Sequence, residues 1–92
     1  MRVVWTRLAR RDLEDVRDYL DNDRAAQKII KLILSGVVTL LEHPFMGKAG
    51  RVNRTRELVV SGTRYIAAYR VVHDSLEILR VLHGARKWPK RM

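Results

Sequence analysis

The sequence predicts an α+β fold whose strands and helices follow the order β-α-α-β-β-β. Two long segments with apolar residues at helical spacing come early in the chain, and three short segments with a period of two come late. Because short turns join these late segments, we expect a twisted, mainly antiparallel sheet with the helix pair packed on one face. The opposite face should be more open, and all 92 residues fit in a single domain, 1–92.

The first strand and the first helix are predicted from residues 2–5 and 9–20. Residues 3–5 are β-branched or aromatic, as in a short strand, and Thr6 is a suitable N-cap for the helix that follows. From Ala9 to Leu20, apolar residues recur every three or four positions, which is typical of an amphipathic helix. The Asp-Asn-Asp run at 21–23 ends this helix and offers a cap for the next one.

The second helix is predicted over residues 26–41, where a broad apolar stripe indicates burial on more than one side. Gly36 interrupts this helix, and we expect it to allow close packing against the first helix. His43 precedes Pro44, which ends the helix because the residue before proline avoids the α region. Residues 45–53 contain two glycines and two basic side chains and indicate an exposed basic loop.

Three strands are predicted at residues 56–60, 65–72 and 76–83, with turns at 61–63 and 73–75. Both alternating sets in 65–72 are mainly apolar, so this strand is expected in the middle of the sheet. Arg70 interrupts that pattern and needs either a carboxylate partner such as Glu57 or an external anion. Simple alternation puts Arg80 with Leu76, Ile78 and Leu82, and His83 with Leu79 and Val81. Arg80 and His83 could then serve one site only if a bulge intervened.

The net charge of the chain is the first indication of its function. The chain carries 19 Lys and Arg against 10 Asp and Glu, a net charge of +9 with a pI near 10.9. Residues 1–41 hold eight basic and six acidic side chains (net +2), whereas residues 42–92 hold eleven and four (net +7). This asymmetry favours an anionic partner, such as nucleic acid, an acidic protein surface or anionic lipid. A surplus of solvated surface cations is the simpler alternative.

Composition also excludes several classes of protein. Cysteine is absent, so disulfides and thiolate metal sites are excluded. The chain has no apolar run near the ~20 residues of a membrane span and no signal-peptide pattern, so we expect a cytoplasmic protein without a membrane partner. P-loop, dinucleotide and nucleophile-elbow motifs are missing, and the three histidines form no helical pair. We therefore expect no metal and no cofactor.

The remaining candidates for chemistry are cations, one carboxylate, one histidine and one indole. Arg56 and Glu57 begin a strand, either as an exposed ion pair or as functional groups. His83 titrates near neutrality and suits general acid–base chemistry, but a histidine that ends a strand can equally be a packing residue. In the tail, Arg86, Lys87 and Trp88 combine cations with an aromatic ring, which suits phosphate contact and stacking. Trp88 could instead plug the tail onto the sheet.

Several short motifs occur in order along nearly the whole chain. They are Ala9…Asp12-Leu13…Tyr19-Leu20, Ala25-Ala26, Leu41…His43-Pro44…Gly47, Thr55-Arg56-Glu57-Leu58, Tyr65-Ile66…Tyr69-Arg70-Val71 and Ile78-Leu79-Arg80-Val81-Leu82-His83-Gly84-Ala85-Arg86…Trp88-Pro89. Together they resemble the RelE/ParE superfamily of bacterial type II toxin–antitoxin toxins. The β-α-α-β-β-β order predicted above is the order that this family implies.

The resemblance implies one of two activities. RelE-like members are mRNA endonucleases that act in the ribosome, whereas ParE-like members poison DNA gyrase without hydrolysis. RelE-like ribonucleases carry an arginine three residues before the central-strand tyrosine, where this chain has Ile66 before Tyr69, and they carry a tyrosine in the tail that this chain lacks. The chain is therefore similar to ParE-like members first, and its cognate antitoxin, expected to be acidic, and DNA gyrase are the implied partners.

The ParE-like interpretation implies a growth-inhibiting toxin of the kind linked to plasmid stabilization, with no catalytic residues. Its expected target contacts are Arg56, Arg70, His83, Arg86, Lys87 and Trp88. The alternative is a RelE-like endonuclease, with the ribosome and mRNA as partners, whose catalytic residues would be Glu57, Arg70, His83 and Arg86. A basic nucleic-acid-binding module is a further alternative from another class.

Overall fold

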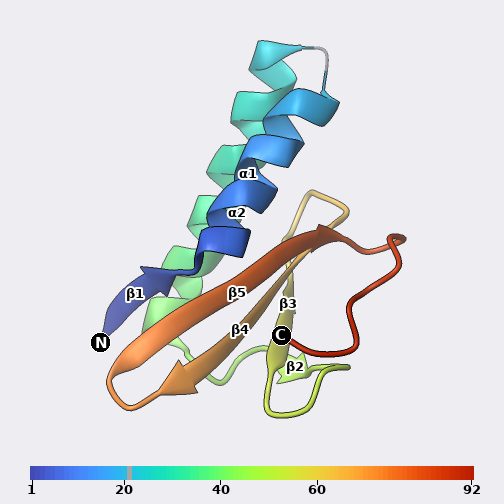
Figure 1. The fold of residues 1–92 in the computed structure, drawn as a ribbon. Coiled ribbons are helices and arrows are strands. Elements are labelled where there is room, and N and C mark those ends of the chain that lie inside the picture. The colour runs from blue at the N-terminus through green and yellow to red at the C-terminus, as the bar shows by residue number, and fades with distance from the viewer. Residues whose placement is uncertain (21) are drawn as a thin grey trace.

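The computed structural model describes residues 1–20 and 22–92, and the predicted fold class is confirmed. The elements are β1 (Arg2–Trp5), α1 (Arg7–Tyr19), α2 (Asp23–Glu42), β2 (Lys48–Ala49), β3 (Arg56–Val59), β4 (Tyr65–Val72) and β5 (Ser75–His83). In the described part of the chain the five strands form one sheet in the order β1-β5-β4-β3-β2. The two helices lie side by side against one face of this sheet (Figure 1).

Both helices begin at residues that the sequence marks as caps. The Thr6 side chain accepts a hydrogen bond from the Ala9 N–H at 3.1 Å and caps α1. The Asn22 side chain accepts from the N–H groups of Arg24 and Ala25 and caps α2, which ends with His43 as C-cap before Pro44. Asp21, the first residue of the expected helix break, lies outside the described residues.

The sheet is mainly antiparallel, and β4 is its middle strand, as predicted. β4 pairs antiparallel with β3 and with β5, whereas β1 pairs parallel with β5. The main core lies between the helices and the sheet. Its fully buried members come from both layers and include Val16, Ile33, Leu40, Ala67, Tyr69 and Ile78. Among the helices of the described ranges, none is long and apolar enough to cross a membrane.

The prediction of a plain loop at residues 45–53 was wrong in one respect, because this segment contains β2. Lys48 and Ala49 pair with Glu57 and Arg56 at the edge of the sheet. Tyr69 supports the approach to β2, since its hydroxyl accepts from the Gly47 N–H at 2.9 Å and donates to the Pro44 carbonyl at 2.8 Å. Burial raises the pKa of Tyr69, while the Gly47 bond and the nearby Arg56 charge oppose that rise.

Gly36 does not serve the expected contact with α1. A Cβ atom at this position would lie 3.4 Å from Leu58 Cδ2 and 3.8 Å from Val60 Cγ2. Gly36 therefore faces β3 and the residue that follows it, and its small size lets α2 approach the sheet rather than the other helix.

Strand β5 contains a bulge that the alternation argument did not include. Ala68 pairs with Arg80 and Tyr69 pairs with Ile78, so Leu79 has no partner on β4. Because of the bulge, Ile78 and Val81 point to the same face of the sheet although they are three residues apart. Both lie in the core under the helices. The predicted grouping of Arg80 with Ile78 was therefore wrong, whereas Arg80 and His83, which both follow the bulge, still point to opposite faces of the sheet.

Candidate functional site

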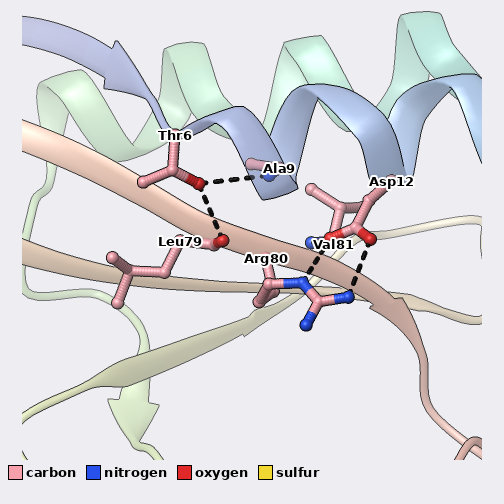
Figure 2. Close-up of polar contacts among 6 residues, drawn as sticks. All are labelled: Thr6, Ala9, Asp12, Leu79, Arg80 and Val81. Carbon is pink, nitrogen blue, oxygen red and sulfur yellow. Dashed lines mark hydrogen bonds and ion pairs between the residues drawn. The ribbon is translucent and has the colours of Figure 1, made fainter. Parts of the chain in front are cut away.

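A polar network at the end of β1 joins α1 to β5 (Figure 2). Asp12 of α1 is 3% exposed, and its carboxylate accepts bonds from Arg80 Nε at 2.8 Å and Arg80 Nη2 at 3.0 Å. The same carboxylate accepts the Val81 N–H at 2.8 Å. These bonds and the charge of Asp12 raise the pKa of Arg80, although burial opposes the rise.

Thr6 completes the network at the start of α1. Its hydroxyl donates to the Leu79 carbonyl at 2.9 Å, beside the bulge. Strand β1 ends at Trp5 and therefore offers no backbone acceptor to the Val81 N–H farther along β5. The Asp12 carboxylate accepts the hydrogen bond from this N–H instead. Arg80 is therefore held within the fold, and this network fixes the end of β5 against α1.

A pocket of about 390 Å³ lies beside this network, between α1 and the paired ends of β4 and β5. Tyr19 lines it from α1, Tyr65 and His83 line it from the strands, and Arg86 lines it from the tail. The rings of Tyr65 and His83 meet edge to face, with centroids 5.6 Å apart. Burial, with a smaller effect of Tyr19, raises the pKa of Tyr65. The pocket thus combines aromatic walls with one histidine, one arginine and the carboxylates of Asp12 and Asp15.

His83 has one ring nitrogen engaged by the chain itself. Its Nδ1 accepts a hydrogen bond from the Ala85 N–H at 3.1 Å. In the neutral ring the remaining proton then lies on Nε2, which makes that atom a donor. His83 is therefore both a packing residue against Tyr65 and a group able to contact a ligand in the pocket.

Glu57 and Arg56 do not form the exposed pair that was one interpretation of the sequence. Glu57 is 3% exposed and accepts three bonds from Arg51: from Nε at 3.0 Å, from Nη2 at 3.1 Å and from the backbone N–H at 2.7 Å. Burial alone would raise the pKa of Glu57, but these bonds and the charges of Arg51 and Lys48 lower it below 4.5. Arg56 instead donates to the carbonyls of Phe45 and Gly47.

Arg51 is a residue that the sequence analysis missed. Besides holding Glu57, its guanidinium lies 3.8 Å from the centre of the Trp88 ring. The contact joins the segment after β2 to the C-terminal tail, and it supports the interpretation of Trp88 as a plug. The sequence around Arg51 or Trp88 gives no indication of this contact, because only the folded sheet brings the two segments together.

The sheet face away from the helices is less open than predicted. Ile66 and Ala68 point to this face because they alternate with core residues of β4, yet they are 9% and 0% exposed. Arg70 shares the face and pairs with Glu77, its cross-strand partner, rather than with Glu57. Of the two alternatives for Arg70, the structure shows a carboxylate partner, but that partner is Glu77 and not the suggested Glu57.

The candidate residues are thus distributed over three places. His83 and Arg86 line the pocket beside α1, Glu57 is buried with Arg51 near β2, and Arg70 lies with Glu77 at the far end of β4 from Tyr65. Lys87 is exposed on the tail. Within residues 1–20 and 22–92, no group of three or more His, Asp or Glu could hold a metal ion.

The fold and these contacts can be compared with known proteins. The model of the ParE toxin of the type II toxin-antitoxin system parDE matches residues 3–88. The chain belongs to the ParE toxin family. Its relatives include the putative toxin Y4kP of Sinorhizobium fredii, which is 38% identical over 91 residues covering 97% of this chain and 94% of the relative. Toxin RelE2 of Caulobacter vibrioides is 35% identical over 86 residues, covering 91% and 96%.

A solved structure agrees with this assignment. The structure of a chromosomal ParDE toxin–antitoxin system from P. aeruginosa superposes with a TM-score of 0.79 at 28% identity, covering 88% of this chain and 92% of that one. The resemblance proposed from the sequence motifs is therefore confirmed. The ParE-family chain is a type II toxin of the RelE/ParE superfamily, and membership of this family implies a cognate antitoxin.

Proposed function

We propose that this ParE-family toxin inhibits DNA gyrase by binding to it, without hydrolysing a substrate. The observation that supports this proposal is the separation of the groups that RNA cleavage would need. Cleavage by attack of a 2′-hydroxyl requires a base, an acid and a cation at a single phosphate. Glu57 is occupied by Arg51, and Arg70 is paired with Glu77, both away from the pocket that His83 and Arg86 line.

Ile66 supports the same proposal. It stands three residues before Tyr69, where the RelE-like ribonucleases have an arginine, and its side chain is buried on the face away from the helices. An isoleucine supplies no charge to a phosphorane-like transition state. The nearby Arg64 is exposed in the turn just before β4 and lies two residues farther from Tyr69 than Ile66 does.

The proposed target contacts centre on the tail and on the pocket beside it. Arg86 and Lys87 are exposed, and His83 lines the same pocket as Arg86. The Arg70 side chain is 48% exposed and keeps part of its guanidinium accessible. Arg56 and Trp88 take part by holding their segments in place. This cationic surface suits an acidic protein or DNA held by a protein, and it also suits an acidic antitoxin.

A supercoiling assay tests the proposal. Purified gyrase and relaxed plasmid are incubated with increasing amounts of the toxin, and we expect loss of supercoiled product. The Arg86→Ala/Lys87→Ala variant should need about tenfold more toxin for the same inhibition, as expected when charge-assisted contacts are lost. Lys28→Ala/Lys31→Ala removes the same charge from the exposed face of α2 and serves as the control. Full supercoiling at a large excess of wild-type toxin would refute the proposal.

The second candidate function is ribosome-dependent mRNA cleavage. It is favoured by the relative named RelE2 and by the presence of His83 and Arg86 in one pocket. In that case His83 would be the acid or base and Arg86 would stabilise the charge of the phosphate. Its signature would be cuts in mRNA on translating ribosomes, with gyrase unaffected.

A further inference from the structure

The tail after β5 carries four cations, Arg86, Lys87, Lys90 and Arg91, without any regular secondary structure. It leaves the sheet at the end of β5 and turns back (Figure 1). Backbone pairing in a helix or sheet does not hold this segment, so its path depends on side-chain contacts. The contact between Trp88 and Arg51 joins this segment to the one after β2.

Trp88 is held by stacking rather than by hydrogen bonding. The Arg51 guanidinium lies 3.8 Å from the ring centroid, within the range of a close cation–π contact. The Trp88 Nε1 atom is buried and has no hydrogen-bond partner among the described residues. Burial of an unpaired N–H is unfavourable, so the stacked face of the ring must supply the attraction that keeps Trp88 in place.

Glu57 fixes the orientation of the Arg51 guanidinium. Both carboxylate oxygens of Glu57 are used, because one accepts from Nε and the backbone N–H of Arg51 and the other accepts from Nη2. Two parallel bonds fix the plane of a guanidinium and leave its face free for an aromatic ring. A lysine at this position has no planar fork, so it could neither hold this geometry nor stack in the same way.

We propose that Glu57 and Arg51 are positioning residues that seat Trp88 and thereby hold the basic tail in the orientation in which it meets the target. We call these three residues the tail seat. The link to the target rests on the proposed function, whereas the seat itself does not. An unseated tail would still carry its four cations, but it would lose conformational freedom on binding and so bind more weakly.

Tryptophan fluorescence tests the seat without reference to any target. In a Trp5→Phe background, Trp88 is the remaining tryptophan, and excitation at its long-wavelength edge avoids the three tyrosines. We expect Arg51→Lys and Arg51→Gln to shift its emission to longer wavelength and to increase quenching by acrylamide, with helical circular dichroism unchanged. Arg54→Asn is the matched control, since Arg54 is an exposed cation of the same loop with φ 64°, a conformation that asparagine tolerates. Identical emission and quenching in the Arg51 variants and the control would overturn the seat.

Gyrase inhibition by the same proteins, with Trp5 restored, tests the positioning role. We expect Arg51→Lys to need about tenfold more toxin than wild type, and Arg54→Asn to match wild type. Trp88→Phe keeps the stacking face and should stay within about twofold of wild type, whereas Trp88→Ala should lose about tenfold. An unseated tail with unchanged inhibition would overturn the positioning role. Wild-type protein that fails to inhibit gyrase would refute the proposed function, and the fluorescence result would still decide the seat.

Discussion

Two buried carboxylates, Asp12 and Glu57, do the same structural work in different parts of the molecule. Each accepts two bonds from one arginine and one bond from a backbone N–H, from Val81 and Arg51 respectively. A buried carboxylate is tolerated when its charge is paired and its lone pairs are satisfied. Both acids therefore fix chain segments that the sheet alone leaves without partners.

Loss of the Asp12 charge should destabilise the fold. Asp12→Asn leaves the Arg80 guanidinium half-paired in a site where its side chain is 16% exposed, and we expect a loss of about 2–4 kcal/mol in the free energy of unfolding. Asp18→Asn, an exposed acid on the same helix, is the control and should change stability by less than about 0.5 kcal/mol. Urea denaturation followed by circular dichroism measures both. Equal stability of the two variants would contradict the role of Asp12.

Glu57 should make stability depend on pH in the acid range. Its pKa in the folded protein is lower than the ordinary 4.5, so the unfolded state takes up the proton first as pH falls. The stabilisation is fully present above pH 4.5 and is lost as pH falls through the folded pKa. We expect the free energy of unfolding of wild type to fall more steeply below pH 4.5 than that of Glu57→Gln. Parallel curves for the two proteins would show that the carboxylate does not contribute in this way.

At the scale of elements, the sequence correctly predicts the features that a few neighbouring residues determine, such as helix ends. Thr6, Asn22 and Pro44 mark helix ends through capping chemistry and proline sterics, and the structure agrees at each of them. Strand β2 and the bulge at Leu79 carry no such signal. The two residues of β2 are strand only because β3 offers them an edge, and the bulge is defined only by the register with β4.

Substitution of two glycines, one with room for a Cβ atom and one without, tests how the elements pack. Gly36→Ala adds a Cβ in ordinary contact with Leu58 and replaces glycine inside a helix, so we expect a gain of about 0.5–1 kcal/mol in stability. Gly47→Ala would bring a Cβ to 2.6 Å from the Tyr69 hydroxyl and 2.9 Å from the Glu57 carbonyl, so we expect a loss of at least about 1–3 kcal/mol. Thermal or urea unfolding of the two variants gives the comparison. Destabilisation by Gly36→Ala beyond that of Gly47→Ala would contradict these packing assignments.

Over the whole molecule, the sequence identified part of the candidate site. His83 and Arg86, singled out by their chemistry, do share a pocket, and Trp88 lies against Arg51 of the segment after β2. Arg51 was missed because its importance arises from Glu57 and Trp88, both of which reach it through the folded sheet. Arg70 was correctly recognised as a charge that needs a partner, but the choice of Glu77 rather than Glu57 depends on cross-strand register, which composition and periodicity do not specify.

The distribution of charges over the whole molecule supports the proposal that the chain binds its target without cleaving RNA. The most buried charges hold α1, β5, the segment after β2 and the tail in place, while most of the net positive charge lies in residues 42–92. Interactions that stabilise the fold leave Glu57 unavailable as a general base. The cations of the tail keep their charge accessible for an anionic partner.

Mapping the 5′ ends of mRNA on translating ribosomes, at a toxin concentration that abolishes gyrase supercoiling, is the most direct test of this conclusion. We predict an mRNA pattern identical to that without toxin, because Glu57 and Arg70 are paired elsewhere in the fold, away from the pocket that His83 and Arg86 line. Cuts in phase with codons that disappear in the His83→Ala variant would contradict it.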